Sequence, residues 1–353
     1  MPPSKTISAH RGAAENPPNR FEPLHLEPDA DWNPEDDGRL RTQFFKDHSK
    51  TVIARNDSPD VGFDASLNPY RGCEHGCIYC YARPTHEYLG FSAGLDFESR
   101  IMVKEDAPEL LRAELLSPKW KPQVIFMSGV TDCYQPVEAK LKLTRRCLEV
   151  LAEFRNPVFI ITKNRLVTRD ADVLSKLAPH NAAAVWLSMT TLDNDLRKVM
   201  EPRTAPPAAR LEAIRELARA GIPAGVNVAP VIPGLTDHEM PAILQAAAKA
   251  GATAAGYTIV RLPYAVAPLF EQWLATHFSD RKEKVLNRLR SLRGGKLNDS
   301  HWGTRMSGEG IFADQMERMF EVARRKAGIC TDSAALSTTA FRCPPGAQLP
   351  LFF

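Results

Sequence analysis

Short apolar runs alternate with longer amphipathic segments through the middle of the chain, and this alternation limits the possible folds most strongly. Each apolar run is bounded by polar residues, Pro or Gly, which is typical of a strand. The expected strands are residues 124–128, 158–162, 184–189, 225–231 and 255–260. The expected helices between them are residues 139–154, 166–178, 205–220 and 238–250. Repeated βα units of this kind build a parallel sheet with helices packed on it.

A further strand is expected to lead into Leu67, which brings the number of βα units to about six. That number is too small for a closed eight-fold barrel, so the sequence predicts an α/β fold built on a partial, TIM-like (β/α)6 barrel. In a barrel of this type the functional loops follow the carboxyl ends of the strands.

The ends of the chain differ in composition from this core, which is expected over residues 51–265. Residues 1–50 are rich in Pro, Asn, Asp and Arg and lack both hydrophobic periods, so they predict an extended or disordered arm. Residues 266–329 predict a helical, basic extension, and residues 330–353 predict a flexible tail.

The composition is that of a globular protein. The chain has 353 residues, of which 44% are hydrophobic and 25% charged, enough to bury a large core. No stretch reaches the roughly 18 apolar residues of a membrane span, and residues 1–20 lack the apolar segment of a secretory signal. A net charge of +3 does not by itself indicate a nucleic-acid binder. These features predict a cytoplasmic protein in a reducing compartment.

Three of the seven cysteines, Cys73, Cys77 and Cys80, form the motif C-x3-C-x2-C. The short spacing and the glycines of the loop permit the tight turns that bring three thiolates to one point. A 4Fe-4S cluster held by three cysteines leaves one iron free to bind a small molecule. The alternative is a zinc site, although no second C-x2-C motif accompanies this one. Its fourth ligand would be one of three residues: His75, His86 or Cys133.

The segment CEHGCIYC resembles the signature of the radical S-adenosylmethionine (SAM) superfamily, in which an aromatic residue precedes the last cysteine. A partial (β/α)6 barrel is also the fold of that superfamily. The resemblance implies two cofactors, a 4Fe-4S cluster and SAM, and a reductant such as flavodoxin or ferredoxin. It further implies that SAM binds the open iron, that one electron cleaves its sulfonium, and that a 5′-deoxyadenosyl radical takes a hydrogen atom from the substrate.

Residues 64–260 are most similar to the spore photoproduct lyase, or DNA repair photolyase-like, branch, which reverses a thymine dimer in DNA. The resemblance implies SAM-binding positions in the loop around the cysteines and after successive strands: Tyr79, Thr131, Asp132, Lys163, Ser188 and Arg203. Asp132 would meet the SAM ammonium, and Lys163 the SAM carboxylate. Tyr81, directly after the third cysteine, matches a position implicated in radical relay.

These assignments have structural alternatives. Tyr81 could pack beside the cluster without further function. Asp132 could cap a helix, and Lys163 could be a solvated lysine at a strand end. Glu201 lies with Arg203 on the expected active face, whereas Arg210 could belong to a solvated helix surface.

One position departs from the lyase pattern. That branch has a cysteine in the loop after the second strand, which returns a hydrogen atom to the substrate radical, and this chain has Gly129 there. Cys133 lies four residues further on and is the remaining candidate catalytic residue for this step. The alternative is a buried, inert cysteine. The resemblance therefore does not imply the same lesion or the same final step.

Seven cations lie within sixteen positions from Arg281 to Lys296, and Trp302 follows them. Cations neutralise phosphates and an exposed aromatic ring stacks on an unpaired base, so this segment predicts contact with a DNA substrate. The alternative is an ordinary solvated helix with an apolar stripe. The stripe would consist of Val285, Leu286, Leu289 and Leu292.

The chain ends in a second short motif. Gln348, Leu349, Leu351 and Phe352 resemble the peptide by which many bacterial replication and repair proteins dock on the DNA sliding clamp. The alternative is a tail that folds back on its own barrel.

Three functions are open on this evidence. The first is a radical SAM enzyme acting on DNA, as in lesion repair, and the second is a radical SAM enzyme that modifies RNA or protein. The third is a zinc-stabilised nucleic-acid-binding protein without catalysis.

Overall fold

The main element of the fold is a seven-stranded sheet in the order β10-β9-β8-β7-β6-β3-β2. The computed structural model describes residues 10–21, 40–329 and 335–344. Six neighbouring strands are parallel, and β2 at one edge is antiparallel. The strands are β2 Ile53–Arg55, β3 Ala65–Leu67, β6 Ile125–Met127, β7 Val158–Thr162, β8 Ala183–Ser188, β9 Ala224–Val231 and β10 Ala254–Ile259. The partial barrel is therefore confirmed, and each predicted strand boundary lies within one residue of the observed one.

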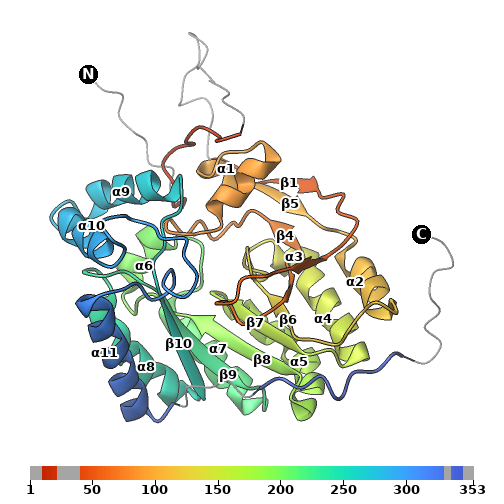
Figure 1. The fold of residues 1–353 in the computed structure, drawn as a ribbon. Coiled ribbons are helices and arrows are strands. Elements are labelled where there is room, and N and C mark those ends of the chain that lie inside the picture. Colours follow the sequence, from red (N-terminus) through yellow and green to blue (C-terminus); the bar gives the residue numbers. More distant parts are fainter. Residues whose placement is uncertain (1–9, 22–39, 330–334, 345–353) are drawn as a thin grey trace, which may run out of the picture.

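Helices cover the outer face of this sheet (Figure 1). They are α2 Ala107–Leu116, α4 Leu143–Phe154, α5 Ala171–Leu177, α7 Pro207–Arg219 and α8 Met240–Ala250, with the 3-10 turns η2 Arg165–Asp170, η3 Ala178–His180 and η4 Asp237–Glu239. Two short helices, α3 Glu138–Leu141 and α6 Asn194–Met200, lie at the end of the barrel where the parallel strands end. The predicted helix over 139–154 is two helices, because Lys142 between them has a left-handed backbone with φ 54°. The sequence prediction missed α6, which begins where Asp193 accepts the amides of Asp195 and Leu196.

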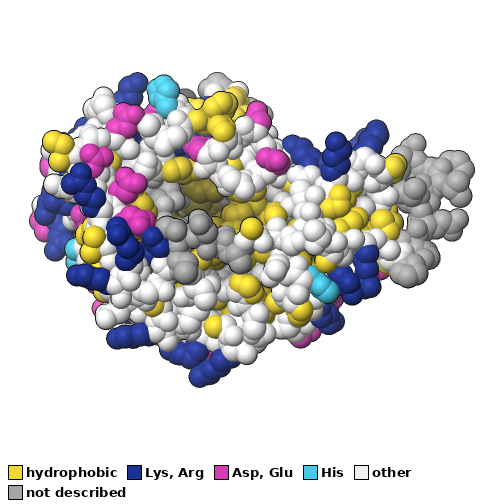
Figure 2. Space-filling view, turned by 60° about the horizontal axis from the view of Figure 1, so that its bottom comes forward, with side chains coloured by type: hydrophobic (Ala, Val, Ile, Leu, Met, Phe, Trp, Pro, Cys, Tyr) yellow, Lys and Arg dark blue, Asp and Glu magenta, His cyan; other side chains and the backbone are white. Residues whose placement is uncertain are grey.

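The two faces of the sheet differ in exposure. Alternate strand residues pack against the helices and are fully buried: Ile125, Met127, Val158, Ile160, Val185 and Leu187. Phe126, Phe159 and Trp186 lie on the other face and are half-buried. Their rings form a row with centroids 5.4 Å apart at each step. The inner face of the barrel is therefore largely aromatic, and Figure 2 shows a hollow in one face of the molecule with hydrophobic side chains on its floor.

A smaller sheet lies above the carboxyl ends of the parallel strands (Figure 1). It consists of β1 Gln43–Lys46, β5 Arg100–Val103 and β4 Tyr70–Arg71, and it is accompanied by η1 Arg83–Leu89 and α1 Leu95–Ser99. Residues 43–46 of the predicted extended or disordered arm form the strand β1, which pairs with β5. Residues 11–20 of the same arm dock on the loop that holds the three cysteines, as described below.

The edges of the main sheet, β2 and β10, do not pair with each other in the part of the chain that the structure describes. An ion pair joins the segments beside these edges. Arg305 Nε donates to Asp60 Oδ2 at 2.6 Å, and Arg305 Nη2 donates to the other oxygen of the same carboxylate. Both side chains are largely buried. Side chains therefore bridge the open side of the partial barrel.

The C-terminal extension is helical, as predicted. It contains α9 Val266–His277, α10 Lys282–Ser291 and α11 Ile311–Ala327. The predicted apolar stripe of α10 is confirmed, since all four residues are buried: Val285, Leu286, Leu289 and Leu292. Across the described ranges, no helix combines the length and the hydropathy needed to cross a membrane.

Residues 335–344, in the segment predicted as a flexible tail, contact the core of the protein. The ring of Phe341 packs 6.2 Å from that of Phe154, and the amide of Arg342 donates to the carbonyl of Phe154 at 2.9 Å. The amide of Ser337 donates to the carbonyl of Asn181 at 2.8 Å. These contacts fasten the segment to the outer helices.

Candidate active site

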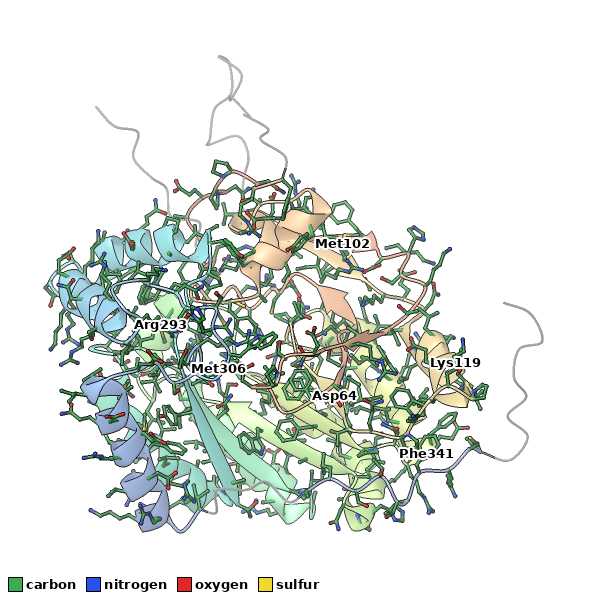
Figure 3. All side chains as sticks on the ribbon, viewed as in Figure 1. Asp64, Met102, Lys119, Arg293, Met306 and Phe341 are labelled. Atoms are coloured by element: carbon green, nitrogen blue, oxygen red, sulfur yellow. The ribbon has the colours of Figure 1, made fainter. Side chains whose placement is uncertain are left out.

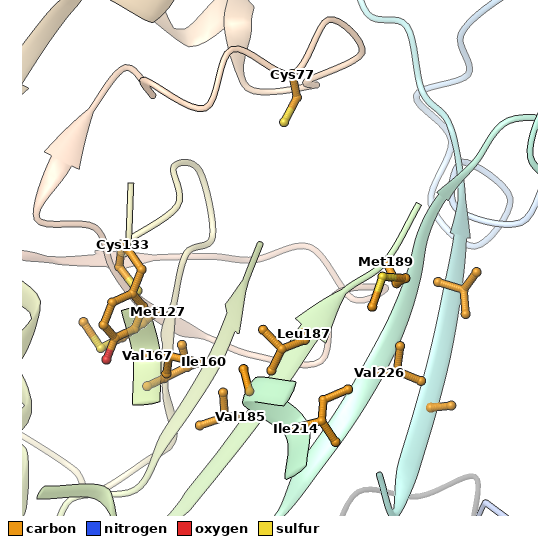
Figure 4. Packing of buried hydrophobic residues seen from close by; sticks show 14 of the residues in the cluster. Cys77, Met127, Cys133, Ile160, Val167, Val185, Leu187, Met189, Ile214 and Val226 are labelled. Atoms are coloured by element: carbon orange, nitrogen blue, oxygen red, sulfur yellow. The ribbon is translucent and has the colours of Figure 1, made fainter. Parts of the chain in front are cut away.

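The three cysteines lie in a loop between β4 and η1, which we call the cluster loop. Successive tight turns form it, with the amides of Gly76, Cys80 and Arg83 donating to the carbonyls of Cys73, Cys77 and Cys80 at 3.3, 3.2 and 3.2 Å. Gly76 has φ 67°, a conformation that favours glycine. In Figure 4 the side chain of Cys77 points toward the carboxyl ends of the parallel strands.

The thiols lie in an apolar environment. Cys73 and Cys77 are buried, and Cys80 is half-buried. Burial raises the pKa of all three thiols above the ordinary value of 9.0. Among the described residues, no three His, Cys, Asp or Glu side chains converge closely enough to share one metal ion. Three sulfur donors in apolar surroundings suit a 4Fe-4S cluster, and their role as its ligands stays a prediction.

The three residues considered as a fourth zinc ligand make contacts elsewhere in the protein. His75 Nδ1 faces Asp132 Oδ2 at 3.3 Å. His86 is buried against the rings of Phe91 and Phe97, and neither of its ring nitrogens has a hydrogen-bond partner among the described residues. Cys133 belongs to the main hydrophobic core.

Residues 11–20, which we call the strap, cross the cluster loop. The amides of Gly12 and Ala13 donate to the carboxylate of Glu98 at 2.9 and 2.8 Å, and Arg83 donates to it at 2.5 Å. A Cβ atom on Gly12 would lie 1.7 Å from the carbonyl oxygen of Gly76, so a larger residue would displace the strap. Sequence reasoning missed the strap, because backbone contacts of this kind leave no hydrophobic pattern.

Asp132 fastens the cluster loop to the barrel. Its Oδ1 accepts the Thr162 hydroxyl at 2.7 Å and the Tyr134 amide at 2.9 Å. Its Oδ2 accepts the Lys163 amide at 2.8 Å and faces His75. Burial alone would raise the pKa of Asp132, but His75 and these donors lower it to about 2. These partners fill the carboxylate's usual capacity of about four, so a direct contact with SAM would require it to exchange one of them.

Thr131 and Cys133 are both buried. The Thr131 hydroxyl donates to the carbonyl of Tyr70 at 3.0 Å, which fixes the strand before the cluster loop. The Cys133 amide donates to the Ser128 hydroxyl at 3.0 Å, and burial raises the pKa of the Cys133 thiol well above 9.0. A hydrogen-atom donor must reach the substrate, so this placement favours the alternative of an inert Cys133.

Lys163 and Ser188 present free polar groups at the ends of their strands. The charge of Lys163 acts on the thiols of Cys77 and Cys80 and lowers their pKa, against the effect of burial. Its Nζ lies 5.8 Å from the centre of the Tyr79 ring. In the described part of the chain, neither the Lys163 ammonium nor the Ser188 hydroxyl has a hydrogen-bond or ion-pair partner. These are the groups that the predicted contact with a SAM carboxylate requires.

Tyr79 belongs to a buried network around Glu201. The hydroxyl of Tyr79 and the guanidinium of Arg210 both donate to the Glu201 carboxylate, and the Thr190 hydroxyl donates at 2.8 Å. Burial alone would raise the pKa of Glu201, but Arg210, Lys163 and Tyr79 lower it to about 2. Arg210 is therefore no surface residue, and it completes a charge pair next to the cluster loop.

Arg203 also holds the cluster loop. Its Nη2 donates to Glu74 at 2.8 Å, and its amide donates to the carbonyl of His75 at 3.3 Å. The other oxygen of Glu74 accepts the amide of Val137 at 2.7 Å. In this structure Arg203 positions the loop, although sequence reasoning assigned it to SAM.

Tyr81 faces the loop after β6. Its side chain is 51% exposed, and its hydroxyl donates to the carbonyl of Gly129 at 2.6 Å. The guanidinium of Arg261 lies 5.8 Å from the centre of its ring. The hydroxyl thus reaches the position at which the lyase branch carries its cysteine.

Comparison with known proteins identifies the family. The sequence model of the radical SAM superfamily matches residues 67–247, which are 181 of the 353 residues. The chain belongs to the radical SAM superfamily. This membership supports an enzyme that uses SAM and a 4Fe-4S cluster, and it weighs against the zinc-stabilised binding protein.

Several curated proteins are similar to this chain over part of their length. An uncharacterized protein of Mycobacterium tuberculosis is 37% identical over 215 residues, which cover 60% of this chain and 63% of that protein. An uncharacterized protein of Methanocaldococcus jannaschii is 33% identical over 173 residues, which cover 49% and 62%. The radical SAM Nalpha-GlyT isomerase of Pseudomonas phage M6 is 27% identical over 223 residues, which cover 63% and 44%. The chain thus spans less than two thirds of each relative.

The fold is shared with spore photoproduct lyase. The lyase complexed with dinucleoside spore photoproduct has a TM-score of 0.56 and 16% identity, over 80% of this chain and 77% of the lyase. A variant of the lyase has a TM-score of 0.58 and 15% identity, over 81% and 80%. At such low identity the likeness shows the fold alone.

Acid should destabilise this radical SAM core through its buried carboxylates. The pKa values of Glu201 and Asp132, each about 2, lie below the ordinary values of 4.5 and 3.8. The ionised carboxylates therefore stabilise the fold above about pH 4.5, and this contribution is lost as the pH falls toward 2. Urea unfolding from about pH 7 down to about pH 2.5 should show a steep fall in the free energy of unfolding.

The variant Glu201→Gln tests the source of that fall. It should lower stability at neutral pH by about 3 kcal/mol or more, because Arg210 is left buried and unpaired. It should also make the acid profile shallower. Glu149→Gln, which alters an exposed ion pair with Arg145, is the control and should change little. Identical profiles for wild type and Glu201→Gln would contradict the prediction.

Proposed function

We propose that the chain reductively cleaves SAM at a 4Fe-4S cluster held by Cys73, Cys77 and Cys80, and that it uses this chemistry on DNA in the cytoplasm. The observation that carries the proposal is the Lys163 ammonium, which follows β7 beside Tyr79 and has no hydrogen-bond or ion-pair partner among the described residues of this member of the radical SAM superfamily. When bound, the cluster supplies the electron that cleaves SAM, and flavodoxin or ferredoxin would be the source of that electron.

The protein's own residues bind, orient and exclude water. Lys163 and Ser188 offer a cation and a hydroxyl to the SAM carboxylate. Asp132 and Glu201 hold the surrounding loops in place through buried contacts. The strap covers the cluster loop and would keep water from it, which strengthens electrostatic interactions in the site.

A DNA substrate is supported by the basic helix α10 and the loop after it. Four of the seven cations form no ion pair with a carboxylate among the described residues: Lys282, Lys284, Arg290 and Lys296. A fifth, Arg281, makes only a long contact, 3.8 Å from Nε to Oδ2 of Asp280. Arg288 pairs with Asp237 at 3.1 Å. Arg293 is buried and donates to backbone carbonyls, so the proposed phosphate contacts do not include it. Trp302 is 59% exposed and available for stacking on a base.

Replacing Cys77 with Ala should abolish both cluster assembly and SAM cleavage, because the open iron depends on all three thiolates. Iron and sulfide analysis after anaerobic purification measures the first, and release of 5′-deoxyadenosine measures the second. Cys343→Ala changes an exposed cysteine and should leave both intact. Retained SAM cleavage in Cys77→Ala would refute the assignment, as would a colourless wild-type protein that contains zinc.

The substrate is tested with the reduced, cluster-loaded enzyme, SAM and ultraviolet-irradiated DNA that carries deuterium on its thymines. We expect deuterium in 5′-deoxyadenosine, because the radical would take its hydrogen atom from the damaged base. Undamaged DNA is the control, and RNA and protein are offered in parallel. Deuterium transfer from RNA or protein, and none from DNA, would favour the second function considered above.

The clamp-docking motif, with Gln348, Leu349, Leu351 and Phe352, lies outside the described residues. We propose that these residues bind the DNA sliding clamp, which fits a role in DNA repair. The full chain should retain the purified clamp in a pull-down assay, and the chain without its last six residues should not. Equal retention by both chains, or by neither, would reject this partner.

A further inference from the structure

Arg261 lies next to the site, two residues beyond the end of β10. The loop that follows α10 packs here, since the amide of Ile259 donates to the carbonyl of Met306 at 2.9 Å. Arg293 reaches the same loop and donates to the carbonyl of Arg305 at 3.0 Å. Figure 3 shows Arg293 and Met306 close together in this region. Three guanidinium groups therefore gather at the end of β10, from Arg261, Arg293 and Arg305.

Within the described ranges, Arg261 is the member of this group whose guanidinium has no oxygen acceptor. Arg305 pairs with Asp60, and Arg293 donates to backbone carbonyls. The Nε of Arg261 is buried and has no hydrogen-bond partner among the residues that the structure describes. Its Nη1 reaches the sulfur of Met306 at 3.6 Å. A thioether sulfur is a weak acceptor. Among the described residues no carboxylate forms an ion pair with Arg261.

A half-buried cation without a counter-charge is unfavourable. Burial lowers the pKa of Arg261, and the neighbouring charge of Arg305 lowers it further. The carboxylates of Asp60 and Asp299 act in the opposite direction, each from a greater distance than an ion pair. A bound anion would supply the missing acceptors. It would also offset the repulsion among the three guanidinium groups.

The guanidinium of Arg261 lies beside the cluster loop. Its guanidinium carbon lies 5.8 Å from the centre of the Tyr81 ring, and Tyr81 directly follows Cys80. The Tyr81 hydroxyl in turn reaches the carbonyl of Gly129 at 2.6 Å, on the opposite loop. An anion held by Arg261 would therefore lie at the candidate active site and not on a remote surface.

We propose that Arg261 binds a phosphate of the substrate's nucleic-acid backbone beside Tyr81. The inference rests on the proposed function and names the residue that anchors its substrate. A guanidinium presents its donors in a planar fork that matches phosphate oxygens. Phosphate fits better than a protein carboxylate, because the cationic helix α10 ends at the same place and the exposed Trp302 lies in the adjoining loop.

The test measures the binding of hexathymidylate to the full chain over a range of salt concentrations. Each phosphate contact to single-stranded DNA contributes about 0.7 to the slope of log K against log salt. Arg261→Met should weaken binding about tenfold and lower this slope by about 0.7. Arg261→Lys should keep the slope and bind less tightly, since it retains the charge and loses the fork. Arg219→Met, an exposed cation on α7, is the control and should match wild type.

Three results would overturn the inference. One is a salt slope for Arg261→Met equal to that of wild type. The second is equal affinity of the wild-type chain for hexathymidylate and its uncharged methylphosphonate analogue, a comparison that needs no variant. The third is preferential binding of an acidic peptide that is lost in Arg261→Met. A failure of the proposed function can be distinguished from these results. In that case the cluster-loaded wild-type enzyme would release no 5′-deoxyadenosine from SAM.

Discussion

Buried carboxylates hold the cysteine loop over the barrel, and the rest of the site depends on them. Four acids make these contacts from the loop and the segments around it: Glu74, Glu98, Asp132 and Glu201. Each is largely or fully removed from water and is matched by an arginine, an imidazole or backbone amides. Breaking such a pair costs about 3–5 kcal/mol, because the remaining charge stays buried. The loop therefore keeps one geometry although it has little regular secondary structure.

The site thus contains residues that hold the loops in place and other residues whose polar groups are available to a ligand. Residues that the family resemblance assigned to SAM divide into two groups in the structure. Asp132 and Arg203 are occupied by contacts within the protein, whereas Lys163 and Ser188 present free groups at strand ends. Arg261 is a third group without a charged partner in the described part of the chain, and its guanidinium carbon lies 5.8 Å from the centre of the Tyr81 ring. Free polar groups in a half-buried site are the ones available to a ligand, since the others would have to give up a partner first.

The strands were predictable because each one is a short apolar run between turn residues, and the six parallel strands follow the predicted order. The three cysteines and Lys163 were equally visible, since a tight cysteine motif and a lysine at the end of an apolar strand are local features. The strap could not be predicted from the sequence. Its contacts run from the amides of Gly12 and Ala13 to Glu98, and a backbone amide carries no sequence signal.

The sequence by itself determined the partial barrel and the membership of the radical SAM superfamily, and it singled out the three cysteines that we propose hold a cluster. These follow from hydrophobic periodicity and from the spacing of a few reactive side chains, which are properties of short segments. Only the tertiary structure decided which charged residues form ion pairs with each other and which remain available to a ligand. In the sequence, Arg210 and Arg293 have the pattern of surface cations, but both are buried in the fold. Arg261 belongs to no sequence motif, and in the described part of the chain its Nε has no hydrogen-bond partner. The physical reason is that the pairing of charges depends on distances between segments far apart in the chain, and no local pattern records those distances.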